Sequence, residues 1–150
     1  MYTNIYTLTY TNVYIHSNPP VLLIACVRAS LDLFDRAGGM TILRQKSIKL
    51  TGYLELLLTS RSVLGQYIHI FTPPRSEERG CQLSITFRNC DIGQIYDLLK
   101  SKGVICDIRK PNVMRIAPTP LYNSYCDVYD FVCILEDIVL GLHTKEGSEL

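Results

Sequence analysis

A short segment in which apolar and polar residues alternate strictly, Gly80–Phe87, restricts the fold of this chain more than any other feature. Alternation with a period of two places successive side chains on opposite faces of a strand. The apolar face carries Cys81, Leu83, Ile85 and Phe87. Because a strand with one apolar face must be covered on that face, the rest of the chain has to supply a second layer.

Two segments with helical spacing precede this strand. Asn18 followed by a proline is typical of a helix N-cap, and it predicts a helix over residues 19–34. Gly38-Gly39 is expected to end this helix, and a second helix is expected over about 41–59. The two helices are predicted to pack together as an αα-hairpin.

The remaining segments predict further strands and two more helices. Asp91 is expected to cap a helix over about 92–101, and Ser124 with Asp127 has the spacing of a capping box before a last helix that ends near residue 142. The other strands are expected at residues 67–71, 104–108 and 113–117. The order ααββαββα predicts an α+β fold in which helices cover a short, mostly antiparallel sheet.

The domain organisation is expected to be simple. At 150 residues the chain is long enough for one ordinary hydrophobic core. Residues 1–15 are rich in Tyr and Thr, a strand-like composition without a clear register. We therefore assign residues 1–16 to an N-terminal segment without a predicted structure, 17–145 to the domain and 146–150 to a tail.

Charge and composition argue against several classes of function. Lys and Arg number 15 against 14 Asp and Glu, so there is no basic field for nucleic acid. The longest apolar run, Val21–Val27, is far shorter than the roughly 20 residues that cross a bilayer, which predicts no membrane span. The first 20 residues contain no Lys or Arg, unlike a signal or transit peptide. The six cysteines show no CxxC spacing, which favours buried free thiols in a reducing, cytoplasmic setting.

No self-sufficient active site is visible in the sequence. His16, His69 and His143 lie far apart and outside any HExxH or Cys/His spacing, so we assign no metal ligand. Glycine-rich phosphate loops and the GxSxG pattern of serine hydrolases are also absent. We therefore assign no catalytic residue.

Arg115 and Asn18 are the two candidate binding residues. Arg115 is expected at a strand end just before Pro118, where a guanidinium could hold a carboxylate through two parallel hydrogen bonds. The alternative is an edge-strand arginine that reaches solvent. Asn18 is accounted for by helix capping, although a helix N-terminus also attracts phosphate or carboxylate groups.

Five motifs, in order over about residues 17–142, closely resemble the C-terminal part of kynureninase. Residues 1–15 do not share this likeness, because the family has a Gly-Phe pair where this chain has residues 13–16, Val-Tyr-Ile-His. The motifs are Ser17-Asn18-Pro19-Pro20 leading into Arg28-Ala29-Ser30-Leu31, Lys49-Leu50-Thr51-Gly52-Tyr53-Leu54-Glu55, Glu77-Glu78-Arg79-Gly80-Cys81-Gln82-Leu83, Arg115-Ile116-Ala117-Pro118 and Pro120-Leu121-Tyr122-Asn123-Ser124.

The resemblance implies the small C-terminal domain of a pyridoxal-phosphate enzyme with the aminotransferase-like, fold type I architecture. It implies a cytosolic homodimer of tryptophan catabolism that hydrolyses kynurenine or 3-hydroxykynurenine at the Cβ–Cγ bond, giving anthranilate or 3-hydroxyanthranilate and alanine. Arg115 matches the family arginine that pairs with the substrate α-carboxylate. Asn18 matches the family asparagine that lies beside the cofactor and near the substrate ring.

The resemblance also implies that essential parts lie elsewhere. The family's Schiff-base lysine and its cofactor-holding residues belong to a large domain upstream, and none of the six lysines here lies in a matching motif. We expect the chain alone to be inactive. The alternatives are a non-catalytic interaction module that associates with a full-length kynureninase, or a stand-alone binder that uses Arg115. A severed fragment is expected to expose an apolar docking face, whereas an independent module would have buried or polarised it.

Overall fold

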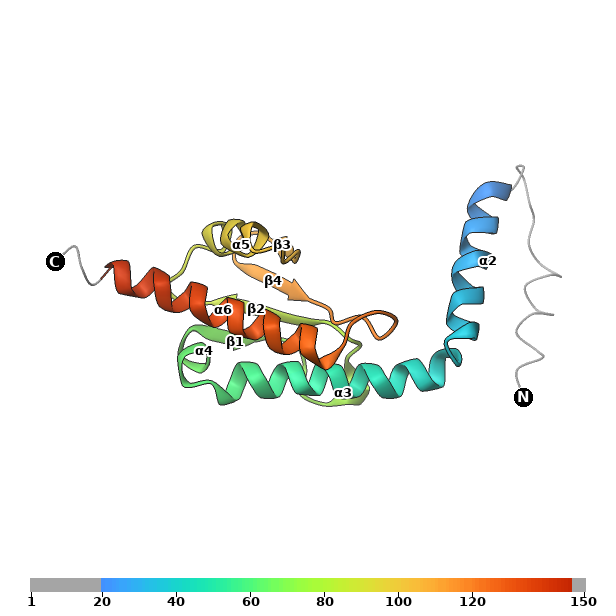
Figure 1. Ribbon diagram of the computed structural model, residues 1–150, viewed down its shortest axis with the longest axis horizontal. Helices are drawn as coiled ribbons and strands as arrows, with labels where there is room; N and C mark the ends of the chain where they lie inside the picture. Colours follow the sequence, from blue (N-terminus) through green and yellow to red (C-terminus); the bar gives the residue numbers. More distant parts are fainter. Residues whose placement is uncertain (1–19, 147–150) are drawn as a thin grey trace.

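The computed structural model describes residues 20–146, which form a two-layer α+β unit with one projecting helix (Figure 1). All strand pairs are antiparallel, in the order β1-β2-β4-β3. The strands are β1 (Ile68–Ile70), β2 (Leu83–Phe87), β3 (Asp107–Arg109) and β4 (Val113–Ile116). The predicted α+β class with a short antiparallel sheet is confirmed.

The strand predicted from strict alternation is β2, in the middle of the sheet between β1 and β4. Leu83, Ile85 and Phe87 are at most 3% exposed, whereas Ser84 and Thr86 on the other face are half-buried. The strand is shorter than predicted at its start. There the Thr51 hydroxyl donates to the Cys81 carbonyl at 3.1 Å, so this stretch is tied to a helix and not to a neighbouring strand.

Four helices share the apolar face of the sheet: α3 (Gly39–Ser60), α4 (Ser62–Tyr67), α5 (Ile92–Ser101) and α6 (Tyr125–Glu146). Their buried side chains form one continuous core with those of β2 and β4. The helices and strands contribute Leu50, Leu54, Leu58, Leu64, Ile95, Leu99, Val132, Leu135, Leu83, Ile85 and Met114, among others. Ser84, Thr86, Val113 and Arg115 lie on the opposite face, which we call the open face, and all are half-buried.

The two predicted helix caps are confirmed. The Asp91 carboxylate accepts hydrogen bonds from the amides of Gly93 and Gln94, both at 3.2 Å, at the start of α5. Before α6, the amide of Ser124 donates to Asp127 at 2.7 Å and the amide of Asp127 donates to the Ser124 hydroxyl at 3.2 Å. This reciprocal pair is the capping box that the spacing predicted.

Two local predictions were wrong in their bounds. Residues 62–67 form the short helix α4 instead of the end of a loop and the start of a strand, because Leu64 is fully buried in the core. β3 begins at Asp107 and not at 104, because the amide of Val104 donates to the carbonyl of Leu99 at 3.0 Å and so still belongs to the end of α5.

The predicted αα-hairpin was also wrong. The helix α2 (Val21–Arg36) begins at Val21 with Pro20 in the N-cap position, later than predicted, and Asn18 lies outside the described residues. Gly38 stops this helix as expected, with a left-handed φ of 98° that favours glycine. α2 then stands away from the body at the end of α3 (Figure 1) and contains no buried residue. The inward side of α3 is already covered by α6 and the core, so its buried face is not available to α2.

The capping box predicts a pH-dependent contribution to stability. The Ser124 amide and hydroxyl lower the pKa of Asp127 from its ordinary value of 3.8. Because the folded pKa is depressed, the contribution is present above 3.8 and is lost as pH falls through the folded pKa. We expect Asp127→Asn to lower the midpoint of thermal unfolding by a few degrees at pH 7, and the difference to shrink at pH values below 3.8.

The matched control is Asp97→Asn on the exposed side of α5, which removes a carboxylate that hydrogen-bonds to no described residue. It should leave the midpoint unchanged to within about one degree, since exposed substitutions away from such features have small effects. An equal fall for both variants would show that net charge, and not the cap, is responsible.

Candidate functional site

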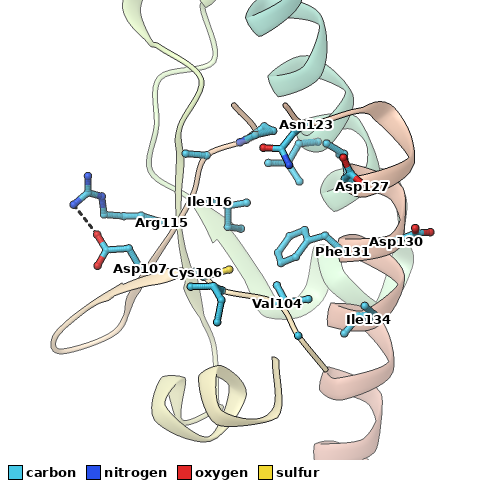
Figure 2. A pocket seen from close by; sticks show the side chains of 16 residues that line it. Val104, Cys106, Asp107, Arg115, Ile116, Asn123, Asp127, Asp130, Phe131 and Ile134 are labelled. Atoms are coloured by element: carbon cyan, nitrogen blue, oxygen red, sulfur yellow. Dashed lines mark ion pairs between the residues drawn. The ribbon is translucent and has the colours of Figure 1, made fainter. Parts of the chain in front are cut away.

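A cavity of about 630 Å³ lies between β4, the loop after α5 and the first half of α6 (Figure 2). Ile116 of β4 and Phe131 of α6 point into it from opposite walls, and Asn123 and Asp127 lie at one end. Asp130 points away from the cavity. The walls are therefore mainly apolar, and they suit a ring or an aliphatic group better than an anion.

Cys106 is the one sulfur on the cavity wall among the described residues. Burial raises the pKa of its thiol to about 11, so the thiol is neutral at physiological pH. Since the thiolate is the nucleophilic form of cysteine, Cys106 is not an activated nucleophile.

Arg115 sits on β4 next to this cavity, but its side chain points away from it (Figure 2). The reason is strand alternation: Met114 and Ile116 face the core, so the residue between them faces the open side of the sheet. The register places Arg115 directly between Ser84 of β2 and Asp107 of β3. Arg115 thus lies on an internal strand, and the alternative of an edge-strand arginine was wrong.

The guanidinium of Arg115 is held by two neighbours. Its Nε donates to Oε1 of Gln82 at 2.9 Å, and its Nη1 lies 2.9 Å from Oδ2 of Asp107. Asp107 also pairs with Arg109 at 2.9 Å, so one carboxylate serves two cations. The Arg115 side chain is 36% exposed, and its Nη2 donates to no other described residue. The group is fixed in direction while one edge of it faces solvent.

The other sequence-predicted site residue, Asn18, lies outside the described residues, so its relation to Arg115 stays a prediction. None of the six cysteines forms a disulfide, as predicted, but none is buried: Cys26 and Cys126 are exposed and the other four are half-buried. Within residues 20–146 no group of His, Cys, Asp and Glu could hold a metal ion. No helix in that range is long and apolar enough to cross a membrane.

Sequence reasoning missed an ionic anchor that joins two of the motifs quoted above. The Glu77-Glu78-Arg79-Gly80 stretch has the composition of a charged surface turn, yet the Arg79 side chain is only 7% exposed and forms an ion pair with Glu55 of α3. The carbonyl of Arg79 accepts from Nη2 of Arg44 at 2.9 Å. The local charge pattern carries no signal for these contacts. Glu55 precedes Arg79 by 24 residues and Arg44 precedes it by 35.

The motif around Pro120 is tied to α3 in the same way. Nζ of Lys46 donates to the carbonyl of Pro120 at 2.7 Å, and the side chain of Asn123 accepts from the amide of Thr119 at 2.7 Å. These bonds fix the loop that runs from β4 to α6, at the end of the strand that carries Arg115. The motifs therefore hold the scaffold around Arg115 in place.

A family comparison matches residues 43–135 to the Kynureninase C-terminal domain. Among curated proteins, the kynureninase of Myxococcus xanthus is 53% identical over 123 residues, covering 80% of this chain and 27% of its own length. The mouse kynureninase is 46% identical over 129 residues, covering 82% and 27%, and the human one is 44% identical over 135 residues, covering 86% and 29%. The chain thus spans little more than a quarter of the length of these relatives.

A solved structure described as a NifS-like protein shares the fold. The alignment has a TM-score of 0.53 and 24% sequence identity. It covers 64% of this chain and 28% of the NifS-like chain. At this identity the likeness concerns the fold alone. It agrees with the aminotransferase-like architecture expected from the sequence.

The partly buried ion pair at Arg79 gives a stability prediction. Arg79→Ala removes the charge-assisted hydrogen bond to Glu55, whose side chain keeps 28% exposure, so we expect the free energy of unfolding in urea denaturation to fall by about 2 kcal/mol. The control is Arg75→Ala, whose side chain is 71% exposed and pairs with exposed Glu77 and Glu78. It should cost less than about 0.5 kcal/mol. Equal losses for the two variants would contradict an anchoring role for Arg79.

Proposed function

Because the chain belongs to the kynureninase C-terminal domain family, we propose that it is the substrate-carboxylate-binding portion of a kynureninase active site. The observation that carries this proposal is the placement of Arg115, which is fixed on the open face by Gln82 and Asp107 with one edge exposed. The remainder of the active site, including the groups that hold the cofactor, is supplied by a large domain. The reading as a separate interaction module stays as the alternative.

The proposed reaction is the hydrolysis of kynurenine or 3-hydroxykynurenine at the Cβ–Cγ bond, with anthranilate or 3-hydroxyanthranilate and alanine as products. The support for it is the name shared by the curated relatives. These substrates are α-amino acids, so each presents a carboxylate beside the reacting carbon. The task of this chain is to orient that carboxylate, which fixes the position of the scissile bond relative to the rest of the site.

The surroundings of Arg115 suit this task. A guanidinium offers planar N–H donors that match a carboxylate, and such charge-assisted hydrogen bonds are roughly twice as strong as neutral ones. Gln82 accepts from Nε, which fixes the plane of the group before any ligand arrives. Asp107 holds Nη1 from one side while the Arg115 side chain remains 36% exposed, so the group is accessible to a ligand. The proposed ligand therefore meets a preorganised and accessible cationic group.

Pyridoxal phosphate, the cofactor that the family implies, does not fit the described residues on their own. Its attachment requires a lysine amine, and no lysine lines the cavity beside β4. Lys46 is engaged with the Pro120 carbonyl, and Lys49, Lys100, Lys102 and Lys110 are exposed. We infer that the cofactor belongs to the large domain. A homodimer in the cytoplasm remains part of the proposal, as the family resemblance implies.

The first test uses the purified 150-residue chain. Because no lysine with a described side chain lies at a built cofactor site, we expect no visible absorbance band after incubation with pyridoxal phosphate and dialysis. We also expect no release of anthranilate from kynurenine, measured by fluorescence. A retained band together with steady turnover would contradict the assignment of the cofactor to another domain.

The second test concerns Arg115 in a complete enzyme. In a chimera, this chain from Pro20 onward replaces the matching C-terminal part of human kynureninase. Arg115→Ala is expected to lower kcat/KM for kynurenine by about 100-fold, since it removes charge-assisted hydrogen bonds worth roughly 1.5–3 kcal/mol. Arg115→Lys should recover part of the loss, because the charge returns without the planar fork.

The control for this test is Arg109→Ala. Arg109 pairs with the same Asp107 but its side chain is 61% exposed on the outer strand β3, so kcat/KM should change less than threefold. A kcat/KM for Arg115→Ala that equals that of the parent chimera would refute the proposed carboxylate contact.

A further inference from the structure

The helix α2 carries an apolar surface that the described chain leaves uncovered. None of its residues is buried, and its seven large aliphatic side chains are each between 54% and 82% exposed. They are Val21, Leu22, Leu23, Ile24, Val27, Leu31 and Leu33. Figure 1 shows α2 as an arm at the far end of α3 from the sheet-covering half of that helix. An exposed patch of this kind marks an interaction site on a folded protein.

The distribution of residues around α2 shows how much of the helix needs cover. Successive residues are turned by about 100°, so the charged side chains Arg28, Asp32, Asp35 and Arg36 gather on one side. Val21 and Ala25 share this charged side, and the other apolar residues of α2 occupy the remaining arc of about 220°. Ser30 is the one polar side chain within this arc, and its hydroxyl donates to the Cys26 carbonyl of the same helix at 3.0 Å. Its polar group is therefore satisfied without a partner protein.

An arc of this width decides between possible occupants. A helix that packs on one flat surface, or on the same helix of a second copy, needs an apolar stripe of only about 100°. A helix that is apolar around most of its circumference is buried on several sides. The partner that covers α2 therefore has to offer a groove, which encloses the apolar arc and leaves only the charged side of the helix in water.

The comparisons locate α2 at a boundary of the family. The C-terminal domain match begins at residue 43, after the end of α2. The human kynureninase nevertheless matches 86% of the chain, about 129 residues, whereas only 108 residues lie from 43 to 150. That match must begin at or before about residue 22, and it includes α2. The helix is thus shared with whole kynureninases, of which nearly three-quarters lies outside this chain.

We propose that α2 is a docking helix that inserts into an apolar groove on the large domain of a kynureninase. Its apolar arc is buried in that groove, and its side with Arg28, Asp32 and Asp35 faces solvent. The proposal rests on the proposed function in naming the partner. It extends that function by assigning the interdomain contact to a helix outside the C-terminal domain match and away from the core.

The test uses Cys26, which lies within the apolar arc and is exposed in the free chain. Alkylation of Cys26 by N-ethylmaleimide is followed by mass spectrometry in the 150-residue chain and in the chimera with human kynureninase. We expect rapid labelling in the chain alone and at least tenfold slower labelling in the chimera. Equal rates would overturn the proposal. Slow labelling in the chain alone, together with a dimer in light scattering, would overturn it in favour of a second copy.

A pair of substitutions separates docking from general effects on folding. Leu23→Glu places a charge in the apolar arc, and in the chimera it should restore Cys26 labelling to within threefold of the free-chain rate. Asp32→Asn changes the charged side and should leave Cys26 protected. Because α2 contains no core residue, both variants of the 150-residue chain should keep the parent midpoint of thermal unfolding. Protection that survives Leu23→Glu would contradict docking through this arc.

The same chimera distinguishes failure of this proposal from failure of the proposed function. Cys26 protection without anthranilate release would support docking and refute the assigned reaction. If the chimera turns over kynurenine, loses this activity on Arg115→Ala, and has Cys26 labelled as fast as in the free chain, the assigned reaction is supported and docking is overturned.

Discussion

All of the helices that build the core cover the same face of a four-stranded sheet, and the remaining organisation follows from this one-sided burial. Leu83 and Ile85 of β2 and Met114 of β4 are completely buried against α3, α5 and α6. The alternation of β2 and β4 then sends the intervening side chains to the open face, where they stay half-buried. Arg115 reaches that face because its neighbours on β4 are required in the core. The same alternation that stabilises the domain therefore delivers the candidate ligand-binding group.

Strand register adds the second element of the site. A shift of β3 by one residue would send Asp107 to the other face and remove the partner of Arg115. The observed pairing instead places Asp107 directly opposite Arg115, within the range of a cross-strand ion pair. The cis peptide bond between Lys110 and Pro111 lies in the short connection between these two strands. Arg115 is thus oriented by backbone pairing as well as by side-chain contacts.

Local patterns in the sequence predicted the elements whose causes are local. The alternation of β2, the Asp91 cap and the Ser124–Asp127 capping box each depend on residues within a few positions, and all three are confirmed. Arg115 was singled out by its strand position and by resemblance, and its orientation fits the proposed role, which stays a prediction. The contacts that no local pattern encodes were missed. The pairing of Arg79 with Glu55 and the isolation of α2 depend on which surfaces meet in three dimensions.

The failure of the hairpin prediction has a physical cause that bears on how the domains associate. Helical spacing reports that α2 has an apolar side but not what covers it. Burial of the six aliphatic side chains in its apolar arc, each already partly shielded, is worth on the order of 10 kcal/mol as an upper bound. Association of two separate molecules costs roughly 4–15 kcal/mol in lost translational and rotational freedom. The net free energy of docking between α2 and a separate chain is therefore close to zero.

Covalent continuity with a large domain removes most of that cost, because the groove is then present at a high effective concentration. The apolar arc of α2 is thus large enough to fix a domain within one polypeptide and marginal for recruitment of a separate one. This favours a kynureninase portion that works within a longer chain over an independent interaction module. An independent module would need a polar α2 surface to remain monomeric, and this chain has the opposite.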